Sequence, residues 1–228
     1  MFFFQSTIHI LSLSFAFPKP MIVSSKSFKR LIDLSFAGLL LIAFSPILLL
    51  AMVAIWFADP GPIFFRQWRE GLDGKPFLML KFRTMYRNAG AILEEHLRKN
   101  PEAEKEWLQY LRLAHDPRTI HAIGPIMRKF SIDELPQLWN ILRGEMSLVG
   151  PRPFALELLQ HLVPSVRMRR QAVLPGLTGL WQVSGRSDLN IKQLQLYDLL
   201  YLKKRSMKMD LWILWRTIPA VIKGTGAY

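Results

Sequence analysis

The sequence predicts a mixed α/β protein, mostly helical. A re-entrant membrane helix–break–helix precedes a compact cytoplasmic domain with a small sheet and interfacial amphipathic helices. Three observations predict this fold class. Residues 34–58 contain no charge. Residues 75–85 alternate in part, as a strand does, but too few such segments follow for a dinucleotide-binding sheet, and no glycine-rich phosphate-binding motif occurs. Residues 133–143 and 154–171, and the chain from residue 195 on, have helical apolar spacing.

The composition restricts the partners that the chain can have. Its 228 residues include 30 Lys and Arg against 17 Asp and Glu, a formal net charge of +13. This excess of positive charge predicts an anionic partner, which can be a nucleic acid, an acidic membrane surface or phosphorylated small molecules. The chain has no cysteine, and this excludes a disulfide framework and a thiolate zinc site.

The uncharged run 34–58 is 25 residues long, enough to cross a bilayer as a helix. Basic residues flank it on both sides, and because they prefer the cytoplasmic side, both ends are expected there. Pro46 removes a helical hydrogen bond near the middle, and Ser45 can bond the freed carbonyl. Each limb would be roughly 18 Å long, short of a hydrocarbon core of about 30 Å. The pattern favours a helix that enters one leaflet and returns; a kinked transmembrane helix is the alternative.

The chain is therefore expected to divide into three parts. Residues 1–25 form an apolar extension to which the sequence assigns no role, residues 26–60 form the re-entrant helix and residues 61–228 form the cytoplasmic domain. Residues 88–114 mix glutamates with Lys and Arg and predict a solvated helix or helical hairpin. Residues 174–186 are punctuated by glycine and predict a loop and a strand. Trp212 and Trp215 suit a helix at a membrane interface, with an amphipathic core helix as the alternative.

An acidic pair, Asp133 and Glu134, lies among basic residues in the stretch FSIDELPQLWNILRGEMSLVGPRP. One interpretation is a capping box, with Ser131 as the N-cap and Glu134 reaching back. Pro136 disfavours this register, because proline is tolerated in the first turn of a helix and not at its fifth position. A helix that begins near Leu135 and Pro136 fits better. Its positive end and the neighbouring arginines are then expected to keep Asp133 ionised, as a metal ligand or a nucleophile.

The basic residues near the pair indicate its substrate, because planar guanidinium groups suit phosphate oxygens. An Mg²⁺ held by Asp133 or Glu134 would bridge the pair to a pyrophosphate. The pattern predicts carboxylates that act on a phosphate held by cations, with a structural ion-pair network as the alternative. The arginines in question are Arg128, Arg143, Arg152 and Arg186.

Five stretches resemble the bacterial sugar transferase family of monotopic phosphoglycosyl transferases. They occur in the family's order, and the resemblance spans residues 28–228. The stretches are FKRLIDLSFAGLLLIAFSPILLL, DPGPIFFRQWREGLDGKPFLMLKFRTM, DPRTI, SIDELPQLWNILRGEMSLVGPRP and LPGLTGLWQVSGR. Larger relatives carry several transmembrane helices and an extra domain before this core, so the chain looks like the minimal catalytic form.

The resemblance implies a monotopic enzyme of the bacterial inner membrane, with its catalytic domain facing the cytoplasm. Such enzymes transfer a sugar 1-phosphate from a UDP-sugar to undecaprenyl phosphate and release UMP. This is the first membrane step of exopolysaccharide, O-antigen, capsule or glycoprotein glycan synthesis. In the family the Ser-Pro break, here Ser45-Pro46, makes the membrane helix re-entrant.

The resemblance also implies roles for single residues. The family's Asp-Glu dyad maps onto Asp133 and Glu134, so Asp133 would form a phosphosugar-aspartyl intermediate with Mg²⁺ beside it. The cationic positions map onto Lys81, Arg128, Arg152 and Arg186. Arg83, on the same predicted strand as Lys81, is a further candidate for binding substrate phosphate.

The resemblance leaves the sugar open among glucose, galactose and an N-acetylated amino sugar. The chain is like the minimal form, whereas GLWQVSGR and GTGAY look more like the larger, hexose-phosphate-transferring members. A nucleic-acid-binding module is disfavoured, because an acidic pair inside the basic region would repel nucleic acid. The expected partners are a UDP-sugar, undecaprenyl phosphate and anionic membrane lipid, not nucleic acid. The sequence does not decide between a monomer and a homodimer.

Overall fold

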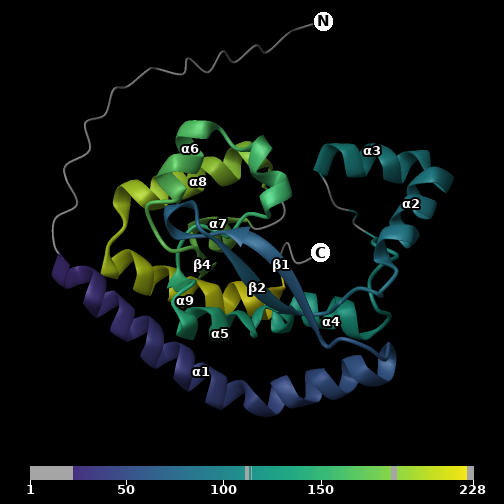
Figure 1. Cartoon of the computed structure of the whole chain (residues 1–228), viewed down its shortest axis with the longest axis horizontal. Coiled ribbons are helices and arrows are strands. Elements are labelled where there is room, and N and C mark those ends of the chain that lie inside the picture. The colour runs from purple at the N-terminus through teal and green to yellow at the C-terminus, as the bar shows by residue number, and fades with distance from the viewer. Residues whose placement is uncertain (1–22, 111–112, 114, 186–188, 225–228) are drawn as a thin grey trace, which may run out of the picture.

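The computed structural model of the chain describes residues 23–110, 113, 115–185 and 189–224. Most of the predicted extension over residues 1–25 lies outside these residues, as does the candidate Arg186. Figure 1 shows one long helix, α1 (Val23–Ala58), along one side of the molecule, with two small sheets and the shorter helices stacked over it.

Helix α1 is continuous through Pro46, so the predicted break is a bend, visible near the middle of the helix in Figure 1. The carbonyl of Ile42 has no backbone donor at the proline and accepts instead from Ser45 Oγ at 2.8 Å. This confirms the expectation that Ser45 bonds the freed carbonyl. By length and composition, the segment Ser27–Ala58 can cross a membrane, and 11% of its most apolar window is buried within the protein. The apolar surface of α1 therefore faces mostly outward.

Polar contacts hold the first half of α1 on the domain. The buried carboxylate of Asp33 accepts hydrogen bonds from Ser147 Oγ at 2.8 Å and from Leu148 N at 3.1 Å, both on strand β3 (Ser147–Val149). Lys29 Nζ lies 2.6 Å from Asp210 Oδ2 on helix α9 (Met207–Lys223). These contacts fix the direction in which α1 leaves the domain.

The strand predicted over residues 75–85 is β2 (Pro76–Phe82). It pairs antiparallel with β1 (Phe64–Glu70) around the 3₁₀ turn η1 (Leu72–Gly74). A second sheet pairs β3 in parallel with β4 (Gly176–Thr178). The residues that the structure describes form no larger sheet, in agreement with the small sheet that the sequence predicts.

The register of the hairpin decides which side chains share a face. Residues directly opposite each other in an antiparallel pair point to the same side of the sheet, and so do residues two apart on one strand. Lys81 lies opposite Phe65, so Lys81, Gln67 and Arg69 share one face. The register pairs on this face are Phe65 with Lys81, Gln67 with Met79 and Arg69 with Phe77.

The remaining helices correct several predicted boundaries. Their bounds are α2 (Ala89–Lys99), α3 (Pro101–Tyr110), α4 (Ile123–Lys129), η2 (Ile132–Glu134), α5 (Gln137–Arg143), η3 (Leu156–His161), α6 (Pro164–Arg170), α7 (Leu180–Ser184) and α8 (Ile191–Lys204). The segments 133–143 and 154–171 each form a 3₁₀ turn followed by a short α-helix, because Pro136 and Pro164 lack the N–H that a continuous helix needs. The segment 174–186 contains the short helix α7 after its strand, and this helix was not predicted.

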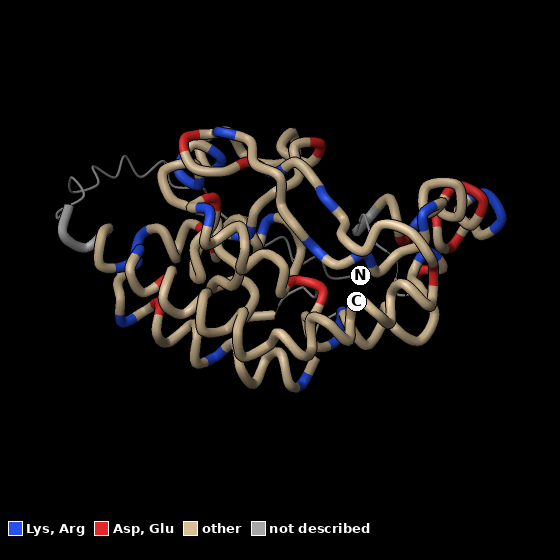
Figure 2. The backbone as a smooth tube through the Cα atoms, turned by 60° about the horizontal axis from the view of Figure 1, so that its bottom comes forward, with Lys and Arg blue, Asp and Glu red and all other residues tan. Residues whose placement is uncertain are grey.

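Helices α2 and α3 form the charged hairpin predicted over residues 88–114. They stand apart from the stacked helices in Figure 1, and the backbone colours of Figure 2 mark both basic and acidic residues along them. At the end of the chain, α9 buries Asp210 and Ile213 and exposes a row of apolar residues. Trp212 and Trp215 in this row are 47% and 72% exposed, which favours the membrane-interface interpretation over that of a core helix.

Asn140 connects helix α5 to the hairpin. This fully buried side chain donates to Leu78 O at 2.9 Å and accepts from Leu80 N at 3.0 Å, so it continues the hydrogen-bond ladder of β2. Leu138 and Ile141 on the same helix are fully buried in the main core cluster. The contact holds this part of β2 against α5, and the next residue of the strand, Lys81, reaches Glu134 in the turn before that helix.

We predict that Asn140→Ala lowers the melting temperature of the detergent-solubilised protein by about 3–10 °C. The substitution leaves two partly buried backbone groups of β2 without their partner, at a cost of roughly 1–3 kcal/mol. Asn100→Ala, at an exposed site between α2 and α3, is the matched control and should shift the melting temperature far less. Equal shifts in the two variants would contradict the role assigned to Asn140.

Candidate active site

The acidic pair lies in the turn η2, directly before helix α5. Ser131 has a left-handed φ of 55° and its side chain makes no capping hydrogen bond, so the capping-box interpretation is wrong. Pro136 occupies the N-cap position of α5, which confirms that the helix begins beside this proline. Asp133 and Glu134 are therefore presented by a turn at the start of a helix.

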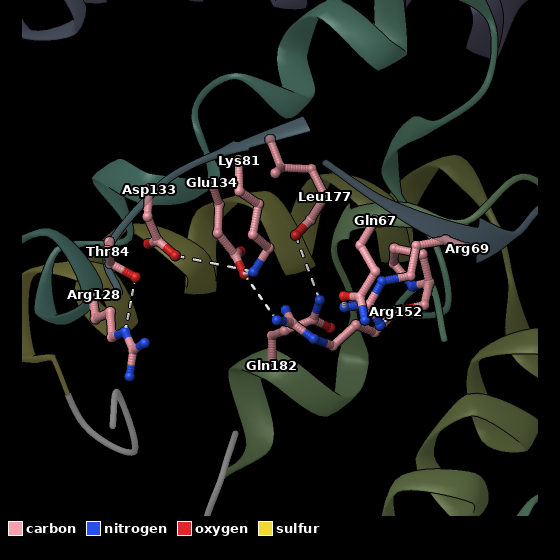
Figure 3. A network of polar contacts seen from close by, with 11 residues as sticks. Gln67, Arg69, Lys81, Thr84, Arg128, Asp133, Glu134, Arg152, Leu177 and Gln182 are labelled. Carbon is pink, nitrogen blue, oxygen red and sulfur yellow. Dashed lines mark hydrogen bonds and ion pairs between the residues drawn. The ribbon is translucent and has the colours of Figure 1, made fainter. Parts of the chain in front are cut away.

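Glu134 joins three separate segments of the chain. Its Oε1 accepts a hydrogen bond from Lys81 Nζ on β2 at 2.9 Å and another from Arg152 Nη2 at 2.8 Å. Figure 3 shows the three side chains pointing toward one another. All are largely shielded from solvent, with Arg152 the most exposed of them at 31%. Ion pairs in such surroundings are screened much less than pairs at the surface.

Asp133 lies beside this ion pair and is more loosely held. The residue is 8% exposed, and its Oδ2 is 4.0 Å from Lys81 Nζ. On its other side lies Arg128 of α4, whose Nε donates to Thr84 Oγ1 at 3.1 Å, as Figure 3 shows. The carboxylate of Asp133 is thus near two cations while neither holds it in a short hydrogen bond.

The pKa values of the two carboxyl groups move in opposite directions. Burial alone would raise the pKa of Glu134, but the charges of Arg152 and Lys81 and their hydrogen bonds hold it well below 4.5. For Asp133, burial is the largest influence and raises the pKa above 3.8, although the charge of Lys81 opposes it. The charges of Arg128 and Arg152 act in the expected direction and favour the ionised form of Asp133, but burial outweighs their effect on the pKa.

Two contacts position Arg152, one through its backbone carbonyl and one between its guanidinium group and an aromatic ring. Its carbonyl oxygen accepts from Arg170 Nη2, and its guanidinium carbon lies 5.5 Å from the ring centroid of Trp181. The preceding loop lies against β4 so closely that a Cβ on Gly176 would be 2.1 Å from Gly150 N, so glycine is required there. Burial disfavours the charged form of Arg152, but the charge of Glu134 outweighs this and raises the pKa of Arg152.

Two predicted phosphate-binding residues lie away from this cluster. Arg83 donates to the carboxylate and the backbone carbonyl of Asp59, just after α1. Arg143 is exposed in the last turn of α5, about 10 Å along the helix axis from the end that carries the acidic pair. Arg186 lies outside the described residues. The structure therefore brings Lys81, Arg128 and Arg152 to the acidic pair.

Three residues near Arg152 were not singled out from the sequence. Gln67 and Arg69 on β1 lie close to Arg152 in Figure 3, and so does Gln182 on α7. The two-residue spacing of Gln67 and Arg69, on a strand adjacent to that of Lys81, indicates a shared face once the hairpin register is known. The sequence treats Arg69 only as one flanking charge of the membrane segment.

The acidic pair also suits a metal ion whose remaining ligands come from the substrate and water. Among the described residues, no group of three or more His, Asp or Glu side chains could hold a metal ion. Mg²⁺ is commonly bound by one or two carboxylates together with water and substrate phosphate. Both cations on Glu134 use Oε1, and no described residue donates to its Oε2. Asp133 and Glu134 can therefore each offer an oxygen.

Comparisons with known proteins extend over nearly the whole chain. The family described as bacterial sugar transferase matches residues 24–224. The chain is 44% identical over 200 residues to the exopolysaccharide production protein ExoY of Rhizobium meliloti, covering 88% of each protein. It is 40% identical to the undecaprenyl-phosphate galactose phosphotransferase of Salmonella typhimurium, covering 90% of this chain and 42% of that protein. It is also 40% identical to the UDP-glucose:undecaprenyl-phosphate glucose-1-phosphate transferase of Caulobacter vibrioides, and the match covers 88% of this chain and 72% of that protein.

We predict that Glu134 makes folding stability depend on acid pH. The pKa of Glu134 in the folded protein is well below 4.5, so the unfolded chain takes up the proton first as the pH falls. The stabilisation of the folded state by Glu134 is therefore complete above about pH 4.5 and decreases as the pH falls below it. Glu134→Gln should lower the free energy of unfolding by about 1–3 kcal/mol at pH 7 and by clearly less at pH 3. Chemical denaturation followed by circular dichroism at both pH values measures this difference.

Glu104→Gln on the exposed face of α3 is the control for this experiment. A surface substitution of this kind should change the free energy of unfolding by no more than about 0.5 kcal/mol at either pH. If Glu134→Gln costs the same at pH 7 and pH 3, the ion pairs with Lys81 and Arg152 do not lower the pKa of Glu134.

Proposed function

The chain belongs to the bacterial sugar transferase family, and on this premise we propose that it transfers a sugar 1-phosphate from a UDP-sugar to undecaprenyl phosphate. The products are UMP and a polyprenyl diphosphosugar, and the reaction is the first membrane step in making an exopolysaccharide or a related surface glycan. Relatives whose names specify galactose or glucose transfer to undecaprenyl phosphate support this activity.

The observation that carries the proposal is that the two carboxylates have different contacts with the neighbouring cations. Glu134 is neutralised by two cations on one oxygen, whereas Asp133 lies beside those cations without a short hydrogen bond to either. A nucleophile needs an accessible lone pair, and a carboxylate with a raised pKa is also more basic. Asp133 is therefore the nucleophile, and Glu134 holds Lys81 and Arg152 in place.

In the first step, a carboxylate oxygen of Asp133 attacks the phosphorus next to the sugar. A new oxygen–phosphorus bond forms, the bond to the bridging oxygen breaks, and its electron pair leaves with UMP. The product is a phosphosugar ester of Asp133. Arg152 and Lys81 lie where they can balance the negative charge on the phosphate oxygens.

In the second step, a phosphate oxygen of undecaprenyl phosphate attacks the same phosphorus. The bond to Asp133 breaks and its electron pair restores the carboxylate, so the enzyme returns to its starting state. When bound by Asp133 and Glu134, Mg²⁺ would supply further positive charge to the phosphates. Arg128, on the side of Asp133 away from Lys81, offers a second cation for the acceptor phosphate.

In this proposal α1 enters one leaflet of the bacterial inner membrane and returns, and the domain faces the cytoplasm. The limb of α1 after Pro46 is roughly 18 Å long, short of a hydrocarbon core of about 30 Å. Basic residues flank both ends of the apolar run, which favours one side for both ends and binding to anionic lipid. The exposed Trp212 and Trp215 of α9 would lie at headgroup level.

We predict that purified protein with undecaprenyl phosphate and Mg²⁺ releases UMP from one or a few members of a panel of UDP-sugars. Asp133→Asn should reduce this release by about 10³-fold or more, because the amide cannot form the covalent intermediate. Without acceptor, a donor labelled with ³²P in the sugar-side phosphate should leave label on the wild-type protein and none on the variant.

Asp73→Asn is the matched control for the nucleophile. Asp73 is exposed in η1 with a φ of 54°, a conformation that asparagine also tolerates, so this variant should release UMP at the wild-type rate. Equal UMP release by Asp133→Asn and the wild type would exclude Asp133 as the nucleophile. No release from any UDP-sugar by folded wild-type protein would contradict the proposed donor class.

We predict that both ends of α1 lie on the cytoplasmic side. Since the chain has no cysteine, single cysteines can be introduced at the exposed Ser27 and Pro62 and labelled with a membrane-impermeant maleimide. Both should be protected in intact spheroplasts and both labelled in inverted vesicles, as should Lys105→Cys, the reference in the cytoplasmic domain. Labelling of one end in each preparation would mean that α1 spans the bilayer.

A further inference from the structure

Arg69 is a shielded cation whose partners are all neutral. Its Nη1 donates to the carbonyl of Pro153 at 3.2 Å and its Nη2 to Gln67 Oε1 at 2.6 Å. Its Nε is buried and has no hydrogen-bond partner among the described residues. The side chain is therefore held firmly while one of its donors stays unused.

Five other arginines in the described part of the chain differ from Arg69 because each has a carboxylate partner at ion-pair distance. The pairs are Arg83 with Asp59, Arg118 with Asp116, Arg152 with Glu134, Arg167 with Glu70 and Arg170 with Asp198. No carboxylate within the described residues lies at ion-pair distance from Arg69. A shielded charge without a counter-charge costs free energy, and an anionic ligand would remove that cost.

The environment of Arg69 makes this cost larger. Burial is the largest influence and, together with the positive charge of Arg152, lowers the pKa of Arg69 to about 10, although Glu157 and Glu134 act in the opposite direction. The side chain therefore remains charged at neutral pH. Two guanidinium groups held near each other in partly desolvated surroundings form a strong site for a phosphate, because each can donate two hydrogen bonds to its oxygens.

The position of Arg69 relative to the acidic pair indicates which phosphate this is. Lys81, Gln67 and Arg69 share one face of the β1–β2 hairpin, with Lys81 at the end next to Asp133. In Figure 3, Arg152 lies between Glu134, which its guanidinium contacts, and the neighbouring side chains of Gln67 and Arg69. A donor diphosphate with one phosphorus at Asp133 would thus extend its other phosphate along β1.

We propose that Arg69 and Arg152 form a subsite for the nucleotide-side phosphate of the donor, with Gln67 orienting Arg69. The inference rests on the proposed function, since it assigns a place to one group of the UDP-sugar. This phosphate carries one negative charge in the donor and gains a second when it leaves as UMP. A pair of guanidinium groups therefore favours the leaving group over the bound substrate.

The test compares the binding of UMP and of uridine, which lacks the phosphate, by isothermal titration with the full-length protein. In the wild type, UMP should bind more tightly than uridine. Arg69→Gln keeps a donor for the carbonyl of Pro153 but removes the charge, so the ratio of the two affinities should fall about tenfold or more, while uridine binds as before. Arg69→Lys should restore part of the ratio.

Arg66→Gln is the matched control, because Arg66 lies on the same strand but on the opposite, exposed face. It should leave the ratio unchanged. Gln67→Leu removes the acceptor that orients Arg69 and should lower the ratio by a smaller factor, which provides a second test if Arg69→Gln does not fold.

An unchanged ratio of affinities in folded Arg69→Gln would overturn the subsite. If that variant instead raises the KM for undecaprenyl phosphate alone, the site belongs to the acceptor phosphate and the inference is wrong. Either result would leave the proposed transferase function intact. Wild-type protein that binds UMP no better than uridine would contradict the subsite, and failure to bind either would contradict the UDP-sugar donor itself.

Discussion

The structure depends on one buried ion-pair cluster, in which Glu134 Oε1 accepts from both Lys81 and Arg152. The three residues come from a strand, a 3₁₀ turn and a proline-flanked loop, which lie far apart in the sequence. A shielded charge costs free energy unless a counter-charge compensates it, so removing one member of the cluster leaves the others at a cost. The cluster thereby closes the hairpin and the Arg152 loop around the turn that carries the acidic pair.

This arrangement explains why two carboxylates are adjacent. Glu134 is strongly stabilised as an anion, and its pKa is well below the ordinary value. Asp133 is exposed to the same positive charge without a short hydrogen bond, and burial raises its pKa. One carboxylate is structural and binds the cations, while its neighbour keeps its lone pairs for chemistry. The two roles need different surroundings, and the turn η2 provides them within two residues.

The membrane helix is attached to the same framework. Asp33 of α1 binds two groups at the start of β3, and β3 leads directly into the loop that presents Arg152. Lys29 pairs with Asp210 on α9, the helix that exposes Trp212 and other apolar side chains. The direction of α1, the outward face of α9 and the position of the cations are therefore coupled, so the active site has a defined orientation relative to the apolar surfaces.

Elements with a local cause could be predicted from the sequence: the apolar helix, the Ser45 bond at its proline, the β2 strand, the charged hairpin and the helix beginning beside Pro136. It also identified the acidic pair among basic residues. Which cations join the pair depends on the fold, because strand register and packing select Lys81 and Arg152 and leave Arg143 at the far end of its helix. The rise in the pKa of Asp133 likewise required the fold, since desolvation depends on neighbours that are distant in the sequence.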